Sequence, residues 1–147
     1  MTAMAINDQQ RAEKSAEAMW ANDNATNWFG MTLDAVGPGS ATMSMTVKQE
    51  QANGHGICHG GVIFALADSA FAFACNSYNR VTVAQSNTIT YVAPAKAGDK
   101  LVADAREVAR SGRSGTWDVT VTNGDGAVIA LFRGLARTIS GTLFEEE

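Results

Sequence analysis

Asn53-Gly54-His55-Gly56-Ile57-Cys58-His59-Gly60-Gly61 runs directly into Val62-Ile63-Phe64-Ala65-Leu66-Ala67-Asp68-Ser69-Ala70-Phe71-Ala72-Phe73-Ala74-Cys75. The first part is a polar, glycine-rich loop, and glycine lets the backbone come close to a ligand. The second part predicts roughly four helical turns that are apolar on every side, which is typical of a buried helix. A carboxylate inside such a helix is unfavourable unless it is paired or hydrogen-bonded, so Asp68 needs a reason to be there. Together, the loop, the helix start and Asp68 predict a functional site.

The composition is that of one folded domain. The chain has 147 residues, of which 46% are hydrophobic and 18% charged, so we expect residues 1–147 to form a single domain with a sizeable core. The net charge of −4 argues against general nucleic-acid binding. Asp68 divides the longest apolar run, so no run reaches membrane length. Residues 1–10 lack the basic and apolar regions of a secretory signal, and we expect a cytoplasmic protein.

Outward from the central helix, the pattern predicts strands and one further helix. Asn7 or Asp8 is a candidate cap for a helix to about residue 22, within an N-terminal helical extension of residues 1–26. Alternation and β-branched residues predict strands over 28–36, 41–47, 81–92, 101–109, 116–122 and 127–139. Residues 140–147 are predicted to be a frayed acidic tail. One buried helix among about six strands predicts an α+β fold, a single antiparallel sheet curled around that helix, and its open edges favour an oligomer.

These residues resemble a known family, the hot-dog-fold thioesterases, and within it the acyl-CoA thioesterases of the phenylacetate-degradation type. The resemblance covers nearly the whole chain and is densest in Asn53-Gly54-His55, Cys58-His59-Gly60-Gly61, Leu66-Ala67-Asp68 and Leu131-Phe132-Arg133-Gly134. It implies a hot-dog fold and hydrolysis of a coenzyme A thioester, with an aryl or phenylacetyl-type acyl group, to the free acid and coenzyme A. It also implies a homotetramer made of two dimers.

The resemblance places the family's site residues by position. Its loop amide, histidine, oxyanion-binding glycine and acid fall on Asn53, His59, Gly60 and Asp68. In the group that also uses a serine on the next strand, that position is Ser86. Some relatives have a threonine four residues after the acid, where this chain has Ala72. Their arrangement of the attacking water is therefore not implied here.

The residue types themselves point to chemistry at the start of the helix. Gly60 and Gly61 stand where the helix should begin, so their N–H groups are unpaired and lie at the positive end of the helix dipole. Such donors suit a thioester oxygen that gains negative charge during attack, although the same glycines would also allow close packing on a strand. Asp68 would act as general base, as nucleophile forming a mixed anhydride, or as a structural carboxylate. His59 would orient the carbonyl, cap the helix or fill space.

Other reactive residues invite simpler interpretations. Cys58, beside the helix start, is a candidate activated thiolate, but a packed thiol is the simpler interpretation. His55, Cys58 and His59 lack an evident fourth ligand, so we predict no metal site and no cofactor besides the coenzyme A of the substrate. Asn53 would orient the substrate or a water, or only close an Asn-Gly turn.

A basic cluster follows the helix. Lys96, Arg110 and Arg113 flank the turns in this part of an otherwise acidic chain. They would hold the phosphates of coenzyme A, or simply form a solvated hairpin tip. Two other functions stay open at this point: a hot-dog acyl-CoA hydratase or dehydratase, and a non-catalytic module that binds acyl-CoA or acyl carrier protein.

The spacing of the two central residues predicts how the chain assembles. Gly60 and Asp68 are eight residues apart, roughly 12 Å along a helix. One thioester carbon cannot contact both from the same helix, because reaction needs contacts of about 3 Å. Two antiparallel copies related by a two-fold axis solve this, with Gly60 of one subunit facing Asp68 of the other. The minimal active unit is therefore predicted to be a homodimer.

Overall fold

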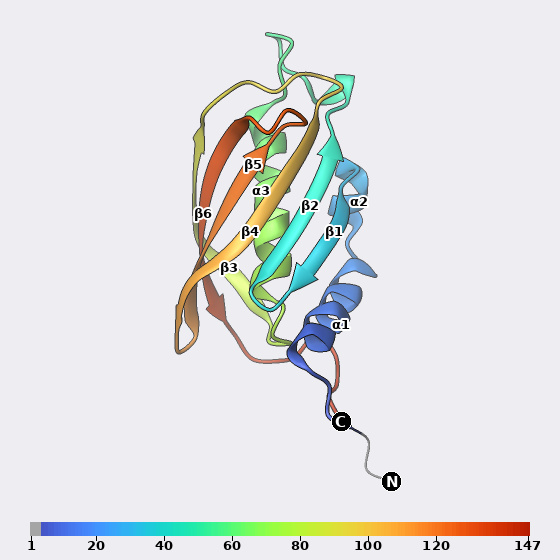
Figure 1. Ribbon diagram of the computed structural model, residues 1–147, viewed down its shortest axis with the longest axis vertical. Coiled ribbons are helices and arrows are strands. Elements are labelled where there is room, and N and C mark those ends of the chain that lie inside the picture. Colours follow the sequence, from blue (N-terminus) through green and yellow to red (C-terminus); the bar gives the residue numbers. More distant parts are fainter. Residues whose placement is uncertain (1–3) are drawn as a thin grey trace.

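The computed structural model describes residues 4–147, so the first three residues of the predicted N-terminal extension lie outside the described residues. A long helix, α3 (Gly60–Cys75), lies against one face of a curved six-stranded antiparallel sheet, and α1 and α2 flank one edge (Figure 1). The other elements are α1 (Asp8–Trp20), α2 (Asn24–Phe29), β1 (Thr32–Gly37), β2 (Ser40–Thr46), a short 3-10 turn (Gln49–Gln51), β3 (Thr82–Tyr91), β4 (Lys100–Ser111), β5 (Ser114–Thr122) and β6 (Val128–Thr138). The strand order is β1-β2-β4-β5-β6-β3, and the predicted hot-dog fold is confirmed.

The core forms where the alternating strands meet α3. Trp117, Val119 and Val121 of β5 are all buried, as their alternation predicts. The ring of Phe71 on α3 packs edge-on against Trp117, with the ring centroids 6.0 Å apart. A Cβ on Gly134 of β6 would lie 2.6 Å from the Phe71 ring, so glycine is needed there for the helix to approach the sheet. Each large side chain buried here stabilises the fold by about 1.5–3 kcal/mol.

Within residues 4–147, only one side of α3 is covered. Its buried residues include Ile63, Leu66 and Phe71, which face the sheet. Gly61 is exposed and Ala65, Asp68 and Ala72 are only partly buried, and together they form a stripe with helical spacing along the helix. The prediction of a helix buried on every side therefore holds for one side of the helix in a single chain.

The predicted strand over residues 28–36 is wrong in its first part. Residues up to Phe29 belong to α2, and β1 begins only at Thr32. The side chain of Asp23 caps α2 by accepting a hydrogen bond of 3.0 Å from the Thr26 N–H, and Gly30 ends it with a left-handed φ of 79°. These two signals outweigh the strand preference of the aromatic pair before Gly30.

The N-terminal helix agrees with its prediction at the start and differs at the end. Asn7 caps α1, since its side chain accepts from the Gln10 N–H and the Gln10 side chain accepts from the Asn7 N–H. The helix ends at Trp20, two residues before the predicted end.

The C-terminal tail is anchored rather than frayed. Asn79 accepts hydrogen bonds from the N–H groups of Leu143 and Phe144 at 2.9 and 3.1 Å, and it donates one to the Phe144 carbonyl at 3.0 Å. Arg11 of α1 forms an ion pair with Glu146. The acidic composition suggested disorder, but these contacts join the tail to α1 and to the loop after α3.

In the described part of the chain, no helix has the length and apolar character to span a membrane.

Candidate active site

His59 determines which backbone N–H groups at the start of α3 are free to bind a ligand. Its Nδ1 accepts a hydrogen bond of 2.8 Å from the Gly61 N–H, so His59 is the N-cap of the helix. The Gly61 donor that we predicted for substrate binding is thus occupied within the chain. The Gly60 N–H makes no hydrogen bond to any residue that the structure describes. It lies at the positive end of α3, where it can donate to an oxygen that gains negative charge.

Tyr91, at the end of β3, holds the other side of Gly60. Its hydroxyl donates a hydrogen bond of 2.8 Å to the Gly60 carbonyl, and 49% of the residue is exposed. A Cβ on Gly60 would lie 3.0 Å from the Tyr91 ring, so a side chain there would press on the tyrosine. No pattern in the sequence marks this contact, because it joins residues that are far apart in the chain.

Asp68 is half-buried on the side of α3 next to β3. Burial raises the pKa of its carboxyl above the ordinary value, and a hydrogen bond from Asn87 partly opposes that rise. The Asn87 Nδ2 donates to Asp68 Oδ1 at 3.0 Å. A carboxylate with a raised pKa is a stronger base than an exposed aspartate, so the environment of Asp68 suits general-base chemistry. Sequence reasoning missed Asn87.

Ser86 does not share this face. It pairs with Leu135 of β6, whereas Asn87 pairs with the buried Gly134. Since neighbouring residues of a strand point to opposite faces, Asn87 points toward α3 and Ser86 points away from it. The register shifts between Ala84 and Ser86, and the extra residue Gln85 reverses the face on which Ser86 lies. The structure thus brings Asn87, and not the predicted Ser86, to Asp68.

A groove opens beside Gly60. It has a volume of about 400 Å³ and is lined by Asn53, Gly60 and Tyr91 together with apolar side chains that include Ile57, Ile63, Val92 and Pro94. The Asn53 Oδ1 accepts hydrogen bonds from the N–H groups of His55 and Ile57 at 2.9 and 3.4 Å, which closes the loop. Its Nδ2 makes no hydrogen bond to a described residue, so that donor faces no competing partner.

The thiols and histidines do not form a reactive or metal-binding group. Burial raises the pKa of Cys58 to about 11 and that of Cys75 to about 12, so both thiols are protonated at neutral pH. The packed-thiol interpretation of Cys58 therefore fits the structure. Within residues 4–147, no three His, Cys, Asp or Glu side chains lie close enough together to hold a metal ion.

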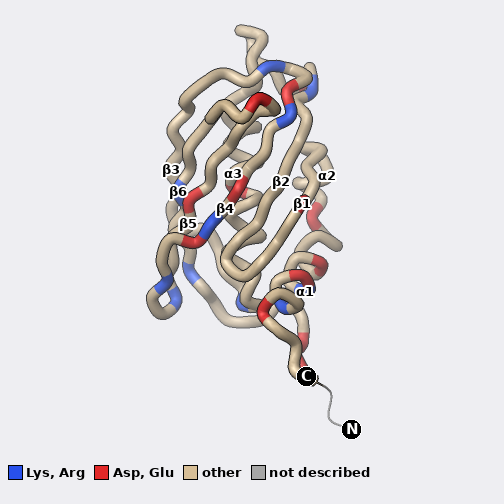
Figure 2. The backbone as a smooth tube through the Cα atoms, in the orientation of Figure 1, with Lys and Arg blue, Asp and Glu red and all other residues tan. Residues whose placement is uncertain are grey.

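The predicted basic cluster is split within one chain. Lys96 precedes β4 and Arg110 lies near its end, and twelve residues of strand span roughly 40 Å. Figure 2 shows basic residues at the β4–β5 hairpin and, separately, at the opposite end of the sheet. The sequence could not reveal this separation, because it depends on how far β4 runs without a turn.

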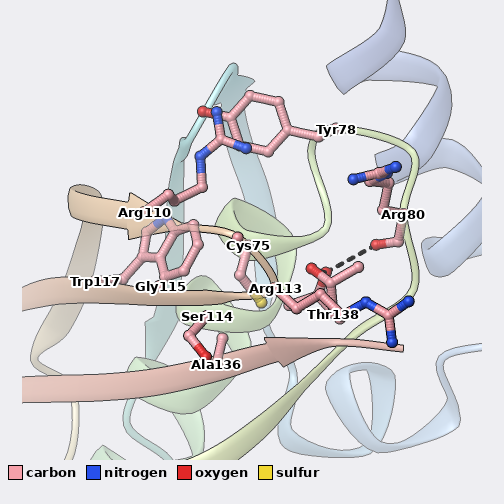
Figure 3. A pocket seen from close by; sticks show the side chains of 12 residues that line it. Cys75, Tyr78, Arg80, Arg110, Arg113, Ser114, Gly115, Trp117, Ala136 and Thr138 are labelled. Atoms are coloured by element: carbon pink, nitrogen blue, oxygen red, sulfur yellow. Dashed lines mark hydrogen bonds between the residues drawn. The ribbon is translucent and has the colours of Figure 1, made fainter. Parts of the chain in front are cut away.

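The hairpin arginines surround a small cavity at the end of α3. The cavity has a volume of about 30 Å³, and Arg80, Arg110 and Arg113 are among its lining residues (Figure 3). The Arg110 guanidinium lies 3.7 Å from the centre of the Tyr78 ring and forms an ion pair of 2.8 Å with Glu107. Arg80, which the sequence did not single out, adds a third positive charge beside the two predicted arginines.

Comparisons with known proteins agree with this fold. Residues 55–130 match the model of the thioesterase superfamily. The chain is 39% identical to the acyl-coenzyme A thioesterase PaaI of Escherichia coli, over 92% of this chain and 97% of that protein. The solved structure of the E. coli PaaI protein, from the phenylacetic acid degradation operon, matches with a TM-score of 0.91 at 38% identity, over 92% of this chain and 99% of that one. A Streptococcus mutans protein bound to acetyl CoA matches with a TM-score of 0.72 at 27% identity, over 76% and 90% of the two chains.

The chain therefore belongs to the thioesterase superfamily. This membership bears out the family resemblance seen in the sequence.

Proposed function

We propose that the protein hydrolyses an acyl-CoA thioester to a free acid and coenzyme A, with Asp68 and Gly60 as its central site residues. The observation that carries this proposal is the half-buried Asp68 on the same helix whose first residue, Gly60, has an N–H without a partner among the described residues. The E. coli relative that is 39% identical over 136 aligned residues is named an acyl-coenzyme A thioesterase, which supports the same activity here.

In this mechanism the thioester oxygen accepts a hydrogen bond from the Gly60 N–H, at the positive end of α3. Asp68 either removes a proton from the attacking water or attacks the thioester carbon itself and forms a mixed anhydride. In both routes the negative charge develops on the oxygen held by Gly60 and the coenzyme A thiol leaves. This chemistry uses a carboxylate, a backbone donor and water, so we propose that it needs no metal or redox cofactor.

We propose further that each site is shared by two subunits of a homodimer, and that two dimers form a tetramer. β3 is an edge strand with a free side, and one stripe of α3 is left uncovered in the single chain. Tyr91 contacts Gly60 and Asn87 contacts Asp68, so Ile89 lies midway between them on β3. A two-fold axis near Ile89 would place Gly60 of one subunit beside Asp68 of the other and would pair the two β3 edges.

The acyl group in this proposal is aryl, of the phenylacetyl type, and occupies the apolar groove beside Gly60. The coenzyme A phosphates would bind Arg110 and Arg113, and Arg80 adds charge to the same rim. The solved relative from the phenylacetic acid degradation operon supports the choice of acyl group. Lys96 stays a predicted phosphate contact at the other end of the sheet.

The two unpaired thiols, Cys58 and Cys75, fit a reducing compartment, so we propose the cytoplasm as the location of the protein.

Release of free thiol from phenylacetyl-CoA, followed with a thiol-reactive chromogen, tests the activity directly. We expect release at a rate above that of hexanoyl-CoA, which has no ring. Both protein thiols are buried, so the enzyme blank should stay low. A hydratase, a dehydratase or a non-catalytic binder would release no thiol, and binding of phenylacetyl-CoA without thiol release would contradict the proposal.

A further inference from the structure

One polar atom next to Asp68 has no partner among the described residues. The Asn87 amide donates through Nδ2 to Asp68 Oδ1, but its own oxygen, Oδ1, is buried and accepts no hydrogen bond from any described residue. Leaving a buried acceptor unpaired is unfavourable, so native structures nearly always supply a partner. We therefore expect a hydrogen-bond donor beside Asn87 Oδ1.

Asp68 offers a second open acceptor at the same place. Its Oδ1 is held by Asn87, and its Oδ2 makes no hydrogen bond to a described residue. Ala72, one helical turn further on the same side of α3, brings no polar group. Two neighbouring acceptors without donors match one water molecule, which carries two O–H donors and no charge. Such a water would have its lone pairs free for attack.

We propose that Asn87 and Asp68 together hold the attacking water, a role that rests on the thioesterase function proposed above. The water donates one O–H to Asp68 Oδ2 and the other to Asn87 Oδ1. As its oxygen bonds to the thioester carbon, the first proton moves to Asp68 and the carbonyl electron pair moves to the oxygen held by Gly60 of the partner subunit. When that pair returns, the C–S bond breaks and the proton on Asp68 passes to the sulfur. The products are the free acid and the coenzyme A thiol.

Among the side chains that β3 and β6 turn toward α3, Asn87 is the one with a free polar atom next to Asp68. β3 turns Asn87, Ile89 and Tyr91 toward α3, and Tyr91 is engaged with Gly60 at the far end of the strand. β6 offers Phe132, Gly134 and Ala136 on the same face, none of which has a polar side chain. Cys75, on the same helix as Asp68, is protonated at neutral pH because burial raises its pKa to about 12.

Two substitutions of Asn87 test the proposal. Asn87→Ala removes both hydrogen bonds, and Asn87→Asp keeps the shape of the side chain but replaces its N–H donor by a second carboxyl oxygen. We expect Asn87→Ala to lower kcat about a hundredfold while KM changes less than about threefold, because the water and not the substrate has lost its contact. In Asn87→Asp we expect the acid limb of the kcat profile to rise by about one pH unit or more, since two carboxyls share one site.

The matched control is Thr88→Ala, which changes the next residue of β3 on the outer face, opposite Arg133. It should keep the kcat and the pH profile of the wild type. If Asn87→Ala and Asn87→Asp also keep kcat within about threefold, with circular dichroism showing native folds, the proposal is overturned. If Asn87→Ala does not fold but Asn87→Asp does, the test rests on Asn87→Asp. An acid limb of its kcat profile that stays at the wild-type pH would then overturn the proposal.

A second readout does not depend on activity. The Asp68 carboxyl can be titrated by carbon-13 NMR in the free protein, and its pKa should rise in Asn87→Ala because the hydrogen bond that lowers it is gone. An unchanged titration overturns the pairing of Asn87 with Asp68. If the wild type hydrolyses no coenzyme A thioester, the proposed function fails, and this titration still tests the pair.

Discussion

At the scale of residues, two hydrogen bonds fix the central helix to the edge strand. Tyr91 contacts Gly60, and Asn87 contacts Asp68. Eight residues of helix rise about 12 Å and four residues of strand about 13 Å, so the two spacings match. One strand thus holds both the proposed oxyanion donor and the proposed base, and a shift of β3 along α3 would disturb the two together.

Asp68→Asn tests the role of the carboxylate. The asparagine keeps the shape of the side chain and can still accept the hydrogen bond from Asn87, so we expect the variant to fold. Turnover of phenylacetyl-CoA should fall at least about a hundredfold, the scale of a lost general base. Near-normal turnover would remove Asp68 from the mechanism.

The same variant predicts a change in the pH dependence of stability. Burial raises the pKa of Asp68 in the folded state, so the folded protein binds this proton more tightly than the unfolded chain does. Ionised Asp68 therefore destabilises the fold above its folded-state pKa, and that destabilisation disappears as the pH falls toward the ordinary value for aspartate. We expect Asp68→Asn to unfold at a higher temperature than the wild type at pH 7, with the difference shrinking near pH 4. A constant difference across that range would contradict the raised pKa.

Residue-scale prediction from the sequence was possible where the signal was local. Gly60 at a helix start and Asp68 in an apolar helix were both visible in one stretch of chain. Asn87 and Tyr91 were not, because their importance comes from partners on another element. Ser86 was misplaced because one bulge residue, Gln85, reverses the faces of the strand after it, and a count along the sequence cannot detect a bulge.

At the scale of elements, the β4–β5 hairpin carries two arginines with different surroundings. Arg110 stacks on Tyr78 and pairs with Glu107, so part of its charge serves the fold. The side chain of Arg113 makes no hydrogen bond or ion pair with a described residue. The two positions should therefore respond differently to substitution.

We predict that Arg113→Ala raises KM for a coenzyme A thioester several-fold and leaves kcat within about twofold. This pattern is expected because a phosphate contact stabilises the bound substrate and the transition state equally. A short thioester without the nucleotide should be unaffected. Arg110→Ala should raise the same KM and also lower the unfolding temperature, because it loses the contact with Tyr78. Arg106→Ala, on the exposed face of β4, is the matched control and should change neither parameter. Equal effects of Arg113→Ala on long and short substrates would show that it does not bind the nucleotide.

One side chain makes most of the hydrogen bonds that hold the C-terminal tail. Asn79 is 3% exposed, has a left-handed φ of 58° and makes three hydrogen bonds to the tail backbone. Asn79→Gly keeps that backbone conformation but loses the bonds, so we expect the free energy of unfolding to fall by about 1–3 kcal/mol. Deleting residues 142–147 should cause little further loss in that variant, measured by urea unfolding, because the ion pair of Glu146 with Arg11 that remains there lies at the surface. Additive losses would mean that Asn79 and the tail stabilise the fold independently.

Most elements could be predicted, because their patterns are local. The alternation of β2 and β5 and the apolar run of α3 each specify a structure within a short window. α2 was missed because its six residues are too few for a periodic pattern, and only Asp23 and Gly30 mark its ends. The tail was predicted as frayed because charge was visible in the sequence and its distant partner, Asn79, was not.

For the whole molecule, the proposed site is incomplete within one chain as residues 4–147 describe it. The Gly60 N–H and Asp68 lie about 12 Å apart on one straight helix, which is too far for one reacting carbon. The uncovered stripe of α3 and the free edge of β3 lie on the surfaces that a two-fold partner would cover. We therefore propose that each site takes Gly60 from one subunit and Asp68, with Asn87, from the other.

Mixing two inactive variants tests whether two subunits share each site. Asp68→Ala lacks the base. Gly60→Pro lacks the oxyanion N–H. The backbone of His59, with a φ of −58° and a ψ of 132°, is compatible with a proline as the next residue. The Tyr91 ring, which a side chain at Gly60 would contact, is exposed and can shift. The two proteins are unfolded together in equal amounts and reassembled, and native mass spectrometry confirms that about half the dimers are mixed.

Each mixed dimer should then contain one site with both lesions and one with neither, so phenylacetyl-CoA hydrolysis should return to about a quarter of the wild-type level. If each site were built within one subunit, every site would keep one lesion. A mixture that contains mixed dimers and stays inactive would contradict the shared site.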